Sequence, residues 1–510
     1  MYLVSSLHLF IDMIRPLIFA PEEGAAMRCP TDDSTIFAGW QVKLLCLIFL
    51  VSGASLSTWS SAAWGRELEG HHGLPPTEVL TLEQCIEMAL KYNPEMAIAR
   101  GKIESAQALS YGSWSQVLPA VNISLINGSR SIQGDRVFNQ DVPVQTNPDG
   151  TVTMDRRETR QAGRSLANFQ FNAAADFKLY DGGQAWNTIR RERQNVTNAR
   201  FNLRAVRNKI AVEVISQYYQ VLKSVRLEKL YSEQVGLNEE LVKQVTSLLE
   251  NGLVGKADEL RARAQLNRMR VEWLNQKKAV LQARSALNTT LGRYRGALLS
   301  TQRLEDRDFV PAPLQASMDE YLASARSKNF EILRDRGIAV AARISERIAR
   351  GIYWPVVTGS VSYARVSSEL DRVYGRFGEN WGLNIGLNVS LDLLKGALPR
   401  AEYLQAQANR IIAEETLEQT INAVTLAIET AVRDFEVSRE IVGMGQESIA
   451  NAEEALRLVE ELYRIGEGTL LDVISARVDL LKTKTDIISS QYDIVIAAEK
   501  LKHASGQLQH

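Results

Sequence analysis

The sequence predicts an α+β membrane protein whose structural plan occurs twice along the chain. Three observations lead to this fold class: strands with one apolar and one polar face, two helical segments of about 65 residues each, and residues that recur at constant spacing. They predict four transmembrane strands per chain, which several copies share in one β-barrel. They also predict long helices in coiled-coil packing that continue from this barrel.

The strands are predicted from strict alternation. From Trp381 to Leu393 every odd position is apolar, and every even position is Gly, Asn, Ser or Asp. The segment from Ala167 to Leu179 alternates similarly, and residues 121–125 and 359–363 are the expected hairpin partners. In a soluble sandwich such strands cover a core, but no further sheet is predicted that could complete one. Strands of roughly 12 to 15 residues instead fit tilted strands that cross a bilayer, with lipid on one face and water on the other.

Four strands cannot close a barrel by themselves. Their sheet has two unpaired edges, and each unsatisfied backbone group costs several kcal/mol in hydrocarbon. Closed barrels start at about eight strands. The chain must therefore share its barrel with copies of itself, and on these physical grounds a dimer and a larger ring are both possible.

The internal repeat is predicted from matching residues at constant offset. Asn93, Arg100, Gly101 and Pro119 recur 236 positions later, whereas Gly182, Gly252, Asp258, Ala262-Arg263, Leu287 and Gly292 recur 214 positions later. One insertion in one loop explains the change of offset, so we interpret the chain as a tandem duplication. The expected parts are a first structural repeat over 81–292, a connector over 293–315, a second structural repeat over 316–506, and a C-terminal tail over 507–510.

Each repeat contains one very long helix. The segments from Gln184 to Glu250 and from Pro399 to Arg464 would each reach about 100 Å. In the second, apolar and small residues step by four and three from Leu417 to Tyr463, which is a heptad seam for packing on neighbouring helices. Residues 258–291 and 317–350 are expected to be separate helices that stack end to end, joined by a connector that contains Pro311 and Pro313.

The first 63 residues have the character of an export signal. Residues 44–56, LLCLIFLVSGASL, form an apolar core that is followed by small residues, and we expect cleavage near Ala63. A single membrane anchor is the alternative, although the segment is shorter than the roughly 20 residues that a spanning helix needs. Met27 is a second candidate start, so the start codon and the cleavage site stay open. Residues 64–80 are expected to be a linker.

Composition and motifs argue against several other functions. The formal net charge is -1, so nothing suggests binding to nucleic acid. The five histidines form no spaced metal set, and we find no P-loop and no GxSxG motif. The chain is therefore expected to be no enzyme and to bind neither a cofactor nor a metal. Of three cysteines, Cys29 and Cys46 lie in the presequence, which leaves Cys85 without a partner for an internal disulfide.

Three segments carry a family resemblance. FKLYDGGQAW at 177–186, NGLVGKADELRAR at 251–263 and RIGEGTLLDVISAR at 464–477, together with the duplicated plan, resemble TolC-like outer-membrane efflux and secretion channels. The resemblance implies a homotrimer in the outer membrane of a Gram-negative bacterium, with a twelve-stranded barrel and twelve helical columns that form a periplasmic tunnel. It also implies a periplasmic adaptor, an inner-membrane pump, outer loops at 128–164 and 367–379, and an equatorial collar near residue 311.

By the same resemblance the two Gly-to-Asp turns form the periplasmic tip. The tip residues expected to dock an adaptor are Gly252, Leu253, Val254, Gly466 and Gly468. Those expected at the gate are Asp258 and Asp472, with Arg261 and Ser475 at the positions where the family often has a second acidic residue. A second charged ring therefore stays in doubt.

Each tip prediction has a structural alternative. Thr469 and Asp472 form a T-x-x-D start signal, so Asp472 and Asp258 can simply cap helices. Three symmetric copies of one Asp would instead form a cation-attracting constriction and raise one another's pKa. Arg261 can neutralise Asp258 at i,i+3 spacing. The apolar pair at 253 and 254 suggests docking, but local packing under the turn is equally compatible.

The sequence therefore predicts a passive export channel that an adaptor opens at its tip, with a periplasmic coiled-coil spacer as the alternative. A spacer has no use for strands with a lipid face. Residues Arg156, Arg157, Arg160 and Arg164 suggest contact with anionic surface lipid or, alternatively, a solvated charged loop. The substrate and the pump class (RND, ABC, MFS or type I secretion) stay open.

Overall fold

The computed structural model describes residues 80–146, 148–292, 304, 314, 316–375, 378–393 and 395–507. The expected signal 1–63, nearly all of the linker 64–80, Pro311 and Pro313, and residues 508–510 lie outside these ranges. Within the described part, no helix combines the length and the apolar character that crossing a membrane requires.

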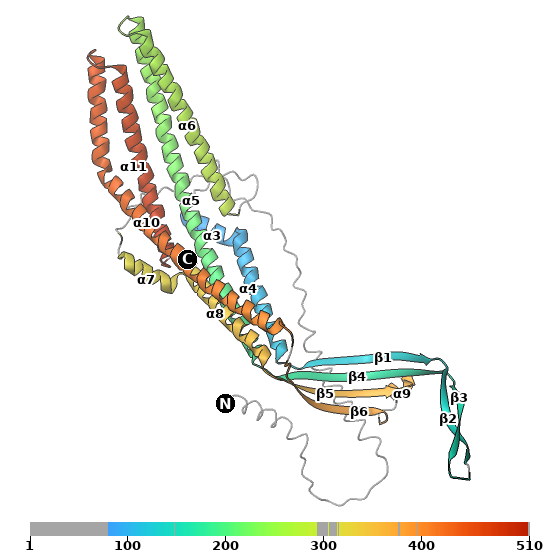
Figure 1. The fold of residues 1–510 in the computed structure, drawn as a ribbon. Helices are drawn as coiled ribbons and strands as arrows, with labels where there is room; N and C mark the ends of the chain where they lie inside the picture. The colour runs from blue at the N-terminus through green and yellow to red at the C-terminus, as the bar shows by residue number, and fades with distance from the viewer. Residues whose placement is uncertain are drawn as a thin grey trace, which may run out of the picture. The chain divides into compact units, whose positions relative to one another are not determined.

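The four expected strands form one antiparallel sheet (Figure 1). Its strands, in spatial order, are β1 (Ala120–Gln133), β4 (Arg164–Asp181), β5 (Val356–Ser367) and β6 (Trp381–Ser390). The central pair, β4 with β5, joins the two repeats. The two outer strands, β1 and β6, each have one backbone edge that pairs with no other described strand.

The register gives the sheet one apolar and one polar face. Paired residues point to the same side, so Leu383, Tyr363 and Ala173 share a face. Asn384 and Ser362 lie on the opposite face. No other element of the described part covers the apolar face of β6, whose Leu383, Ile385 and Leu387 are all more than half exposed. The two-faced sheet predicted from the alternation is confirmed.

Two expectations about this region were wrong. The strand predicted to run to Leu393 ends at Ser390, because the next position would pair with Pro355, which has no N–H to donate. The predicted outer loop 128–164 contains regular structure: β1 continues to Gln133, and β2 (Arg136–Thr146) pairs with β3 (Val152–Gln161). The alternation of apolar and polar residues that predicts the other strands does not reveal this hairpin, because nearly all of its residues are exposed on both faces.

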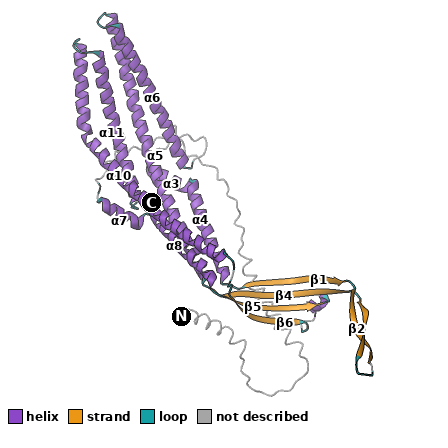
Figure 2. Ribbon diagram, viewed as in Figure 1, coloured by secondary structure: helices purple, strands orange, loops and turns teal. Residues whose placement is uncertain are grey.

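The helices follow the duplicated plan (Figure 2). In chain order they are α3 (Leu82–Tyr92), α4 (Pro94–Gly112), α5 (Gln184–Glu250), α6 (Lys256–Thr290), α7 (Met318–Lys328), α8 (Phe330–Arg350), α9 (Leu370–Gly375), α10 (Leu398–Arg464) and α11 (Leu470–Ala504). Two short 3-10 turns, Ser113–Gln116 and Gly351–Tyr353, lead from helices into strands. The two long helices, α5 and α10, have 67 residues each, which confirms the predicted lengths.

The helices pack side by side in a row of four columns. α6 and α4 both lie on α5, α8 lies between α5 and α10, and α11 packs along α10 and also contacts α5. The columns are therefore α4 with α6, then α5, then α8 with α11, then α10. One side of the row ends at α4 and α6, and the other ends at α10.

The prediction of end-to-end stacking named the wrong pair of helices. The sequence predicts that α6 stacks on a single helix over 317–350. That segment is instead two helices, which meet at Asn329, and α6 ends against the start of α4. Asn93 caps α4 by accepting from the Glu95 N–H at 2.8 Å, and its Nδ2 donates to the Thr290 carbonyl at the end of α6, at 2.9 Å.

The second repeat has the same junction. Asn329 accepts from the N–H groups of Glu331 and Ile332, at 2.9 and 3.3 Å, and donates to the Ala504 carbonyl at the end of α11, at 2.9 Å. Gly506 turns the chain away there with a φ of 73°, as Gly292 does at the first junction with 72°. Each of the two split columns, α4 with α6 and α8 with α11, thus consists of two helices from the same repeat, and its junction residues are those that the offsets identified.

The heptad seam of α10 is its packed face. Val424, Ile428, Ala431 and Phe435 are buried, and no seam position from 417 to 463 is exposed. Gly445 lies on the same seam, where a Cβ atom would come 3.0 Å from the Ile487 side chain of α11. A glycine at this position lets the Ile487 side chain of α11 pack against α10. Two equivalent apolar clusters surround the helix junctions, one built on α3 and α5 and the other on α7, α8 and α10.

Candidate functional site

The two Gly-to-Asp turns connect α5 to α6 and α10 to α11, at the helix ends farthest from the sheet (Figure 1). In the first turn Gly252 has a φ of 74°, its N–H donates to Leu249 O, and the N–H of Leu253 donates to Leu248 O. In the second, Gly466 has a φ of 85°, and Glu467 N–H donates to Leu462 O. Both are glycine C-caps that satisfy the last carbonyls of a long helix.

The two turns differ in how the following helix begins. Thr469 caps α11: its hydroxyl oxygen accepts from the Asp472 N–H at 3.3 Å, and Asp472 Oδ2 accepts from the Thr469 N–H at 3.1 Å. The predicted T-x-x-D capping box is confirmed. In the first turn Gly255 occupies the cap position and has no side chain to contribute. Gly468 is required for packing, because a Cβ there would lie 2.9 Å from the Tyr463 nitrogen.

The two candidate gate carboxylates have different partners. Asp472 accepts a 2.6 Å hydrogen bond from the Thr469 hydroxyl, and this bond with the backbone bond lowers the pKa of Asp472. Asp258 pairs with Arg261 Nη1 at 3.1 Å, so the neutralisation predicted at i,i+3 spacing is confirmed within one chain. Ser475 is exposed. The charge at position 258 is thus partly compensated, whereas no basic side chain pairs with Asp472 in the described part.

A buried carboxylate beside the first turn was missed by the sequence reasoning. Glu259 is 2% exposed and accepts from Lys256 Nζ, and it pairs with Arg263 Nη2 at 2.6 Å. The hydrogen bond from Lys256 is the main cause that lowers the pKa of Glu259. Lys256 lies one turn before Glu259 on α6 and Arg263 one turn after it, and these i,i+3 and i,i+4 spacings were the available signal.

An apolar cluster beneath the turns holds the two hairpins together. It consists of Leu241, Val245, Ala262, Leu470 and Ile474, with Val242, Val254 and Tyr463 packed against it. Within the predicted apolar pair the two residues therefore differ. Val254 packs against this cluster, whereas the side chain of Leu253 is 71% exposed.

Two further residues connect the hairpins. Arg477 on α11 donates to Leu237 O of α5 at 3.1 Å, and its Nη2 bonds Glu460 of α10 at 2.6 Å. Tyr463 lies near Asp258, and burial, followed by the charge of Asp258, raises the pKa of the Tyr463 phenol. Arg477 belongs to the repeated Ala-Arg pair, but its partners could not be inferred from the sequence.

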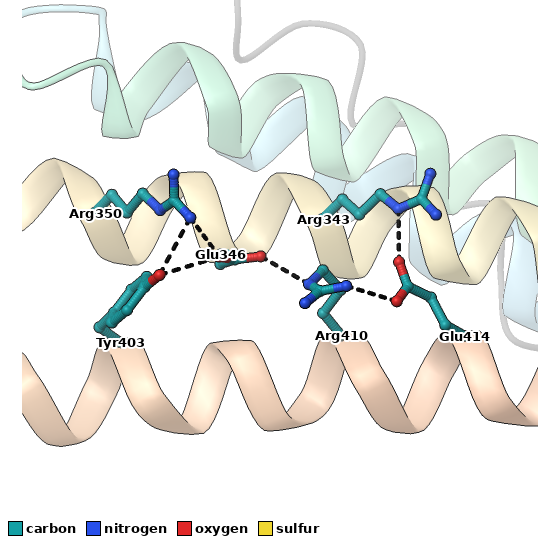
Figure 3. A network of polar contacts seen from close by, with 6 residues as sticks. All are labelled: Arg343, Glu346, Arg350, Tyr403, Arg410 and Glu414. Carbon is teal, nitrogen blue, oxygen red and sulfur yellow. Dashed lines mark hydrogen bonds and ion pairs between the residues drawn. The ribbon is translucent and has the colours of Figure 1, made fainter.

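A second polar network ties α8 to α10 near the sheet (Figure 3). Glu346 is 8% exposed and bonds Arg350 Nη2 at 2.7 Å and Arg410 Nε at 2.9 Å. Arg410 Nη1 also pairs with Glu414 Oε2 at 2.6 Å, and Arg343 Nε donates to Glu414 Oε1 at 2.8 Å. Tyr403 also donates to Glu346. Since every charged group is paired, we interpret the network as a helix-to-helix contact.

An open groove of about 410 Å³ lies between α5, α8 and α10. Its two charged lining residues are both engaged: Asp335 bonds Arg334 and the Thr420 hydroxyl at 2.7 Å each, and Arg191 pairs with Glu192 at 2.7 Å. Among the described residues, no group of three or more His, Cys, Asp or Glu side chains is arranged to hold a metal ion. Cys85 is buried and forms no disulfide with another described residue.

Both sides of the four-column row expose apolar side chains. On the α4 and α6 side these are Ile98, Leu109, Tyr111, Leu260, Val271, Leu274 and Leu281. On α10 they are Leu404, Ile411, Ile412, Leu426, Val437, Met444, Leu458 and Leu462. The two edge strands of the sheet are next to the outer columns in sequence, since β1 follows α4 and β6 precedes α10. The two edges of the chain are different surfaces.

The comparisons with known proteins agree with this architecture. The profile of a family described as outer membrane efflux protein matches residues 85–293 and 322–507, which is more than half of the chain. Outer membrane protein TolC of Escherichia coli K12 is 24% identical over 274 residues, which cover 52% of this chain and 55% of that protein. The chain thus spans about half the length of this curated relative.

Solved structures share the fold. CusC, described as forming a transmembrane channel, superposes with a TM-score of 0.69 at 19% identity, over 83% of this chain and 92% of its own. The CmeC outer membrane channel of Campylobacter jejuni gives 0.70 at 19% identity, over 83% and 85%. The MtrE outer membrane channel of Neisseria gonorrhoeae, solved in its open state, gives 0.66 at 17% identity, over 83% and 88%.

Proposed function

We infer that this chain, which belongs to the outer membrane efflux protein family, assembles with two further copies into a channel that conducts substrates from the periplasm to the exterior. Its place is the outer membrane of a Gram-negative bacterium. In this proposal a periplasmic adaptor opens the channel at the two Gly-to-Asp turns, and an inner-membrane pump supplies the energy. The channel itself performs no chemistry on its substrate.

One observation carries the proposal: a four-stranded sheet with an apolar face, a polar face and two unpaired edges. In hydrocarbon, unpaired edges are too costly, so β6 of one copy must pair with β1 of the next. The apolar face then meets lipid, and the polar face, with Asn384, Ser362 and Asn172, lines a wet lumen. A spacer protein would have no use for such a sheet.

The helical edges support the same head-to-tail assembly. The exposed apolar residues of α6 would pack against those of α10 in the next copy, which buries both stripes. A heterologous contact of this kind forms either a closed ring or an open filament. Closure of the barrel selects the ring.

The width that a conducting lumen needs sets the minimum number of copies. Two copies would give eight strands, and the interior of such a barrel is just wide enough for side chains to fill. A conducting barrel therefore needs at least a third copy. Three copies give twelve strands and twelve helical columns, in agreement with the resemblance noted above.

Purified protein in planar bilayers tests the proposal. We expect ion conductance in discrete steps and a trimer in detergent. A folded monomer without conductance would contradict the proposal, and a trimer with no conductance would favour the spacer alternative.

At the turns, Asp472 is the proposed gate residue, because its carboxylate carries no basic partner in the described part. Three copies around one axis would attract cations and repel anions. Asp472→Asn removes the charge but keeps an oxygen that can accept from the Thr469 N–H, whereas Thr469→Val removes a cap and keeps the charge. We expect D472N, but not T469V, to weaken cation selectivity in bilayers. Equal effects of the two variants would assign Asp472 a capping role only.

The exposed Leu253 is the proposed adaptor contact, and Val254 supports the turn from beneath. A cysteine at position 253 should crosslink to a co-expressed adaptor in the periplasm. A cysteine at position 236, in the middle of α5, is the matched control. Crosslinks at neither position, or at both to the same extent, would argue against docking at this turn.

A further inference from the structure

The short helix α9 lies on the apolar face of the sheet, at the strand ends farthest from the long helices (Figure 1). Tyr374 of α9 meets Phe171 of β4 edge to face, with ring centroids 6.3 Å apart. Phe171 pairs with Arg365, and Arg365 pairs with Trp381, so all three lie on the apolar face. The segment expected to be an outer loop thus folds back over one end of this face.

A buried arginine holds α9 there. Arg365 is 2% exposed, although the preceding residues on the same face of β5, Val361 and Tyr363, are apolar. Its Nη2 donates to the carbonyl of Arg372 in α9 at 3.1 Å and to the carbonyl of Glu379 at 3.2 Å. A charged group on a lipid-facing strand is costly unless it is covered and bonded. Here the backbone carbonyls of Arg372 and Glu379 supply the bonds.

The height of Arg365 along the strand matches one boundary of a bilayer. It lies nine residues beyond Val356, where β5 begins. With about 3.4 Å per residue and a tilt of about 40°, this distance raises Arg365 roughly 23 Å, close to the roughly 25 Å height of an apolar band. Aromatic residues mark both levels: Tyr353 and Trp354 at the start of the strand, and Tyr363 stacked on Trp381 near its end. Such aromatic girdles lie at membrane interfaces.

The side chains of α9 fit the same position. Val373 is 2% exposed beneath the helix, and Leu370 and Tyr374 flank it and remain 42% and 38% exposed. On the other side Arg372 pairs with Glu369 at 2.8 Å, and both side chains are about half exposed. One side of α9 is therefore apolar and aromatic and the other polar, as for a helix that lies along an interface.

We propose that α9 lies in the interfacial layer of the outer leaflet, between the barrel wall and the lipid headgroups, and that Arg365 anchors it. The partner is a lipid surface, which α9 contacts through the exposed parts of Leu370 and Tyr374. We do not attribute the contact to charge attraction, because α9 itself carries one acidic and one basic residue, Asp371 and Arg372. The proposal rests on the proposed function, since it requires the apolar face to meet lipid.

Spin labels on single cysteines test this placement in trimers reconstituted into phospholipid vesicles, with Cys85 replaced by Ser. We expect a label at position 370 to collide more with oxygen than with a water-soluble nickel complex. A label at 385 on the apolar face is the lipid control, and one at 384 on the polar face is the water control. If 385 reports lipid but 370 behaves like 384, α9 does not lie in the membrane interface. If 385 itself reports water, the proposed function fails as well.

The anchor is tested by Arg365→Met, which keeps a long side chain but cannot donate. We expect the label at 370 to lose its lipid exposure and to become more mobile, while channel conductance shows that the barrel still assembles. Glu369→Gln, which breaks only the exposed pair with Arg372, should leave the label unchanged. An unchanged label in R365M would remove Arg365 as the anchor. If R365M fails to assemble, the label at 370 in the otherwise native chain still decides the placement.

Discussion

Replacing Asn329 with Ala should loosen the junction between α8 and α11. Asn329 is 4% exposed and makes three hydrogen bonds: two cap α8, and one satisfies the Ala504 carbonyl. Loss of a side-chain cap costs about 0.5 to 2 kcal/mol, and a buried carbonyl left without its partner costs about 1 to 3 kcal/mol more. The two contributions together span about 1.5 to 5 kcal/mol, and from the middle of this span we expect a local destabilisation of about 2 to 4 kcal/mol.

Hydrogen exchange measured by mass spectrometry can detect this change in the assembled protein, where global unfolding is commonly irreversible. A loss of about 2 to 4 kcal/mol in local opening accelerates exchange roughly 30- to 700-fold in peptides around 330 and 504. Asn93→Ala at the first junction is the matched variant and should have a smaller effect, because Asn93 is only partly buried.

Asn329→Ser separates the two contributions. A serine can cap α8 but is too short to reach the Ala504 carbonyl, so exchange should accelerate to an intermediate degree. If N329A exchanges like the native protein, the junction contributes nothing to local stability. If N329S does so, the cap alone holds this junction and the contact between the two helices is incidental.

Three further predictions follow from packing, burial and hairpin contacts. Gly445→Ala should lower local stability by at least about 1 kcal/mol relative to Gly443→Ala, measured by hydrogen exchange in peptides around 445, because a Cβ at 445 meets Ile487, whereas a Cβ at 443 meets nothing within 4 Å. Equal exchange in the two variants would refute this packing. Burial lowers the pKa of His503 below the ordinary 6.5, so the folded state should lose stability as pH falls below this value. In His503→Gln the melting temperature should therefore change less between about pH 7 and 5 than in the native protein. If the variant shows the same pH dependence as the native protein, the loss of stability comes from other titrating groups. Arg477→Met removes the bonds to α5 and α10, so the open fraction in bilayer recordings should increase; an unchanged fraction would make these bonds irrelevant to gating.

Local patterns in the sequence were sufficient for the elements themselves. The 67-residue helices, the glycine turns, and the Thr469 cap each depend on neighbours within a few positions, so periodicity and spacing reveal them. The same holds for the two faces of the sheet, because successive side chains in a strand alternate. The hairpin β2–β3 was missed because neither of its faces is buried. A strand needs apolar residues at every second position only when one of its faces is buried.

Partners distant in sequence were decided only by the tertiary structure. Nothing near Thr290 or Asn329 in the chain indicates that α6 ends on α4 and that α11 ends on α8. The exposed Leu253 and the packed Val254 look alike in sequence, and the Arg477 contact with Leu237 joins residues 240 positions apart. An amphipathic segment specifies which face it buries but not which surface covers that face, because apolar contact is not directional. The covering surface, and with it the columns, the open edges and the position of α9, depends on how the whole chain packs.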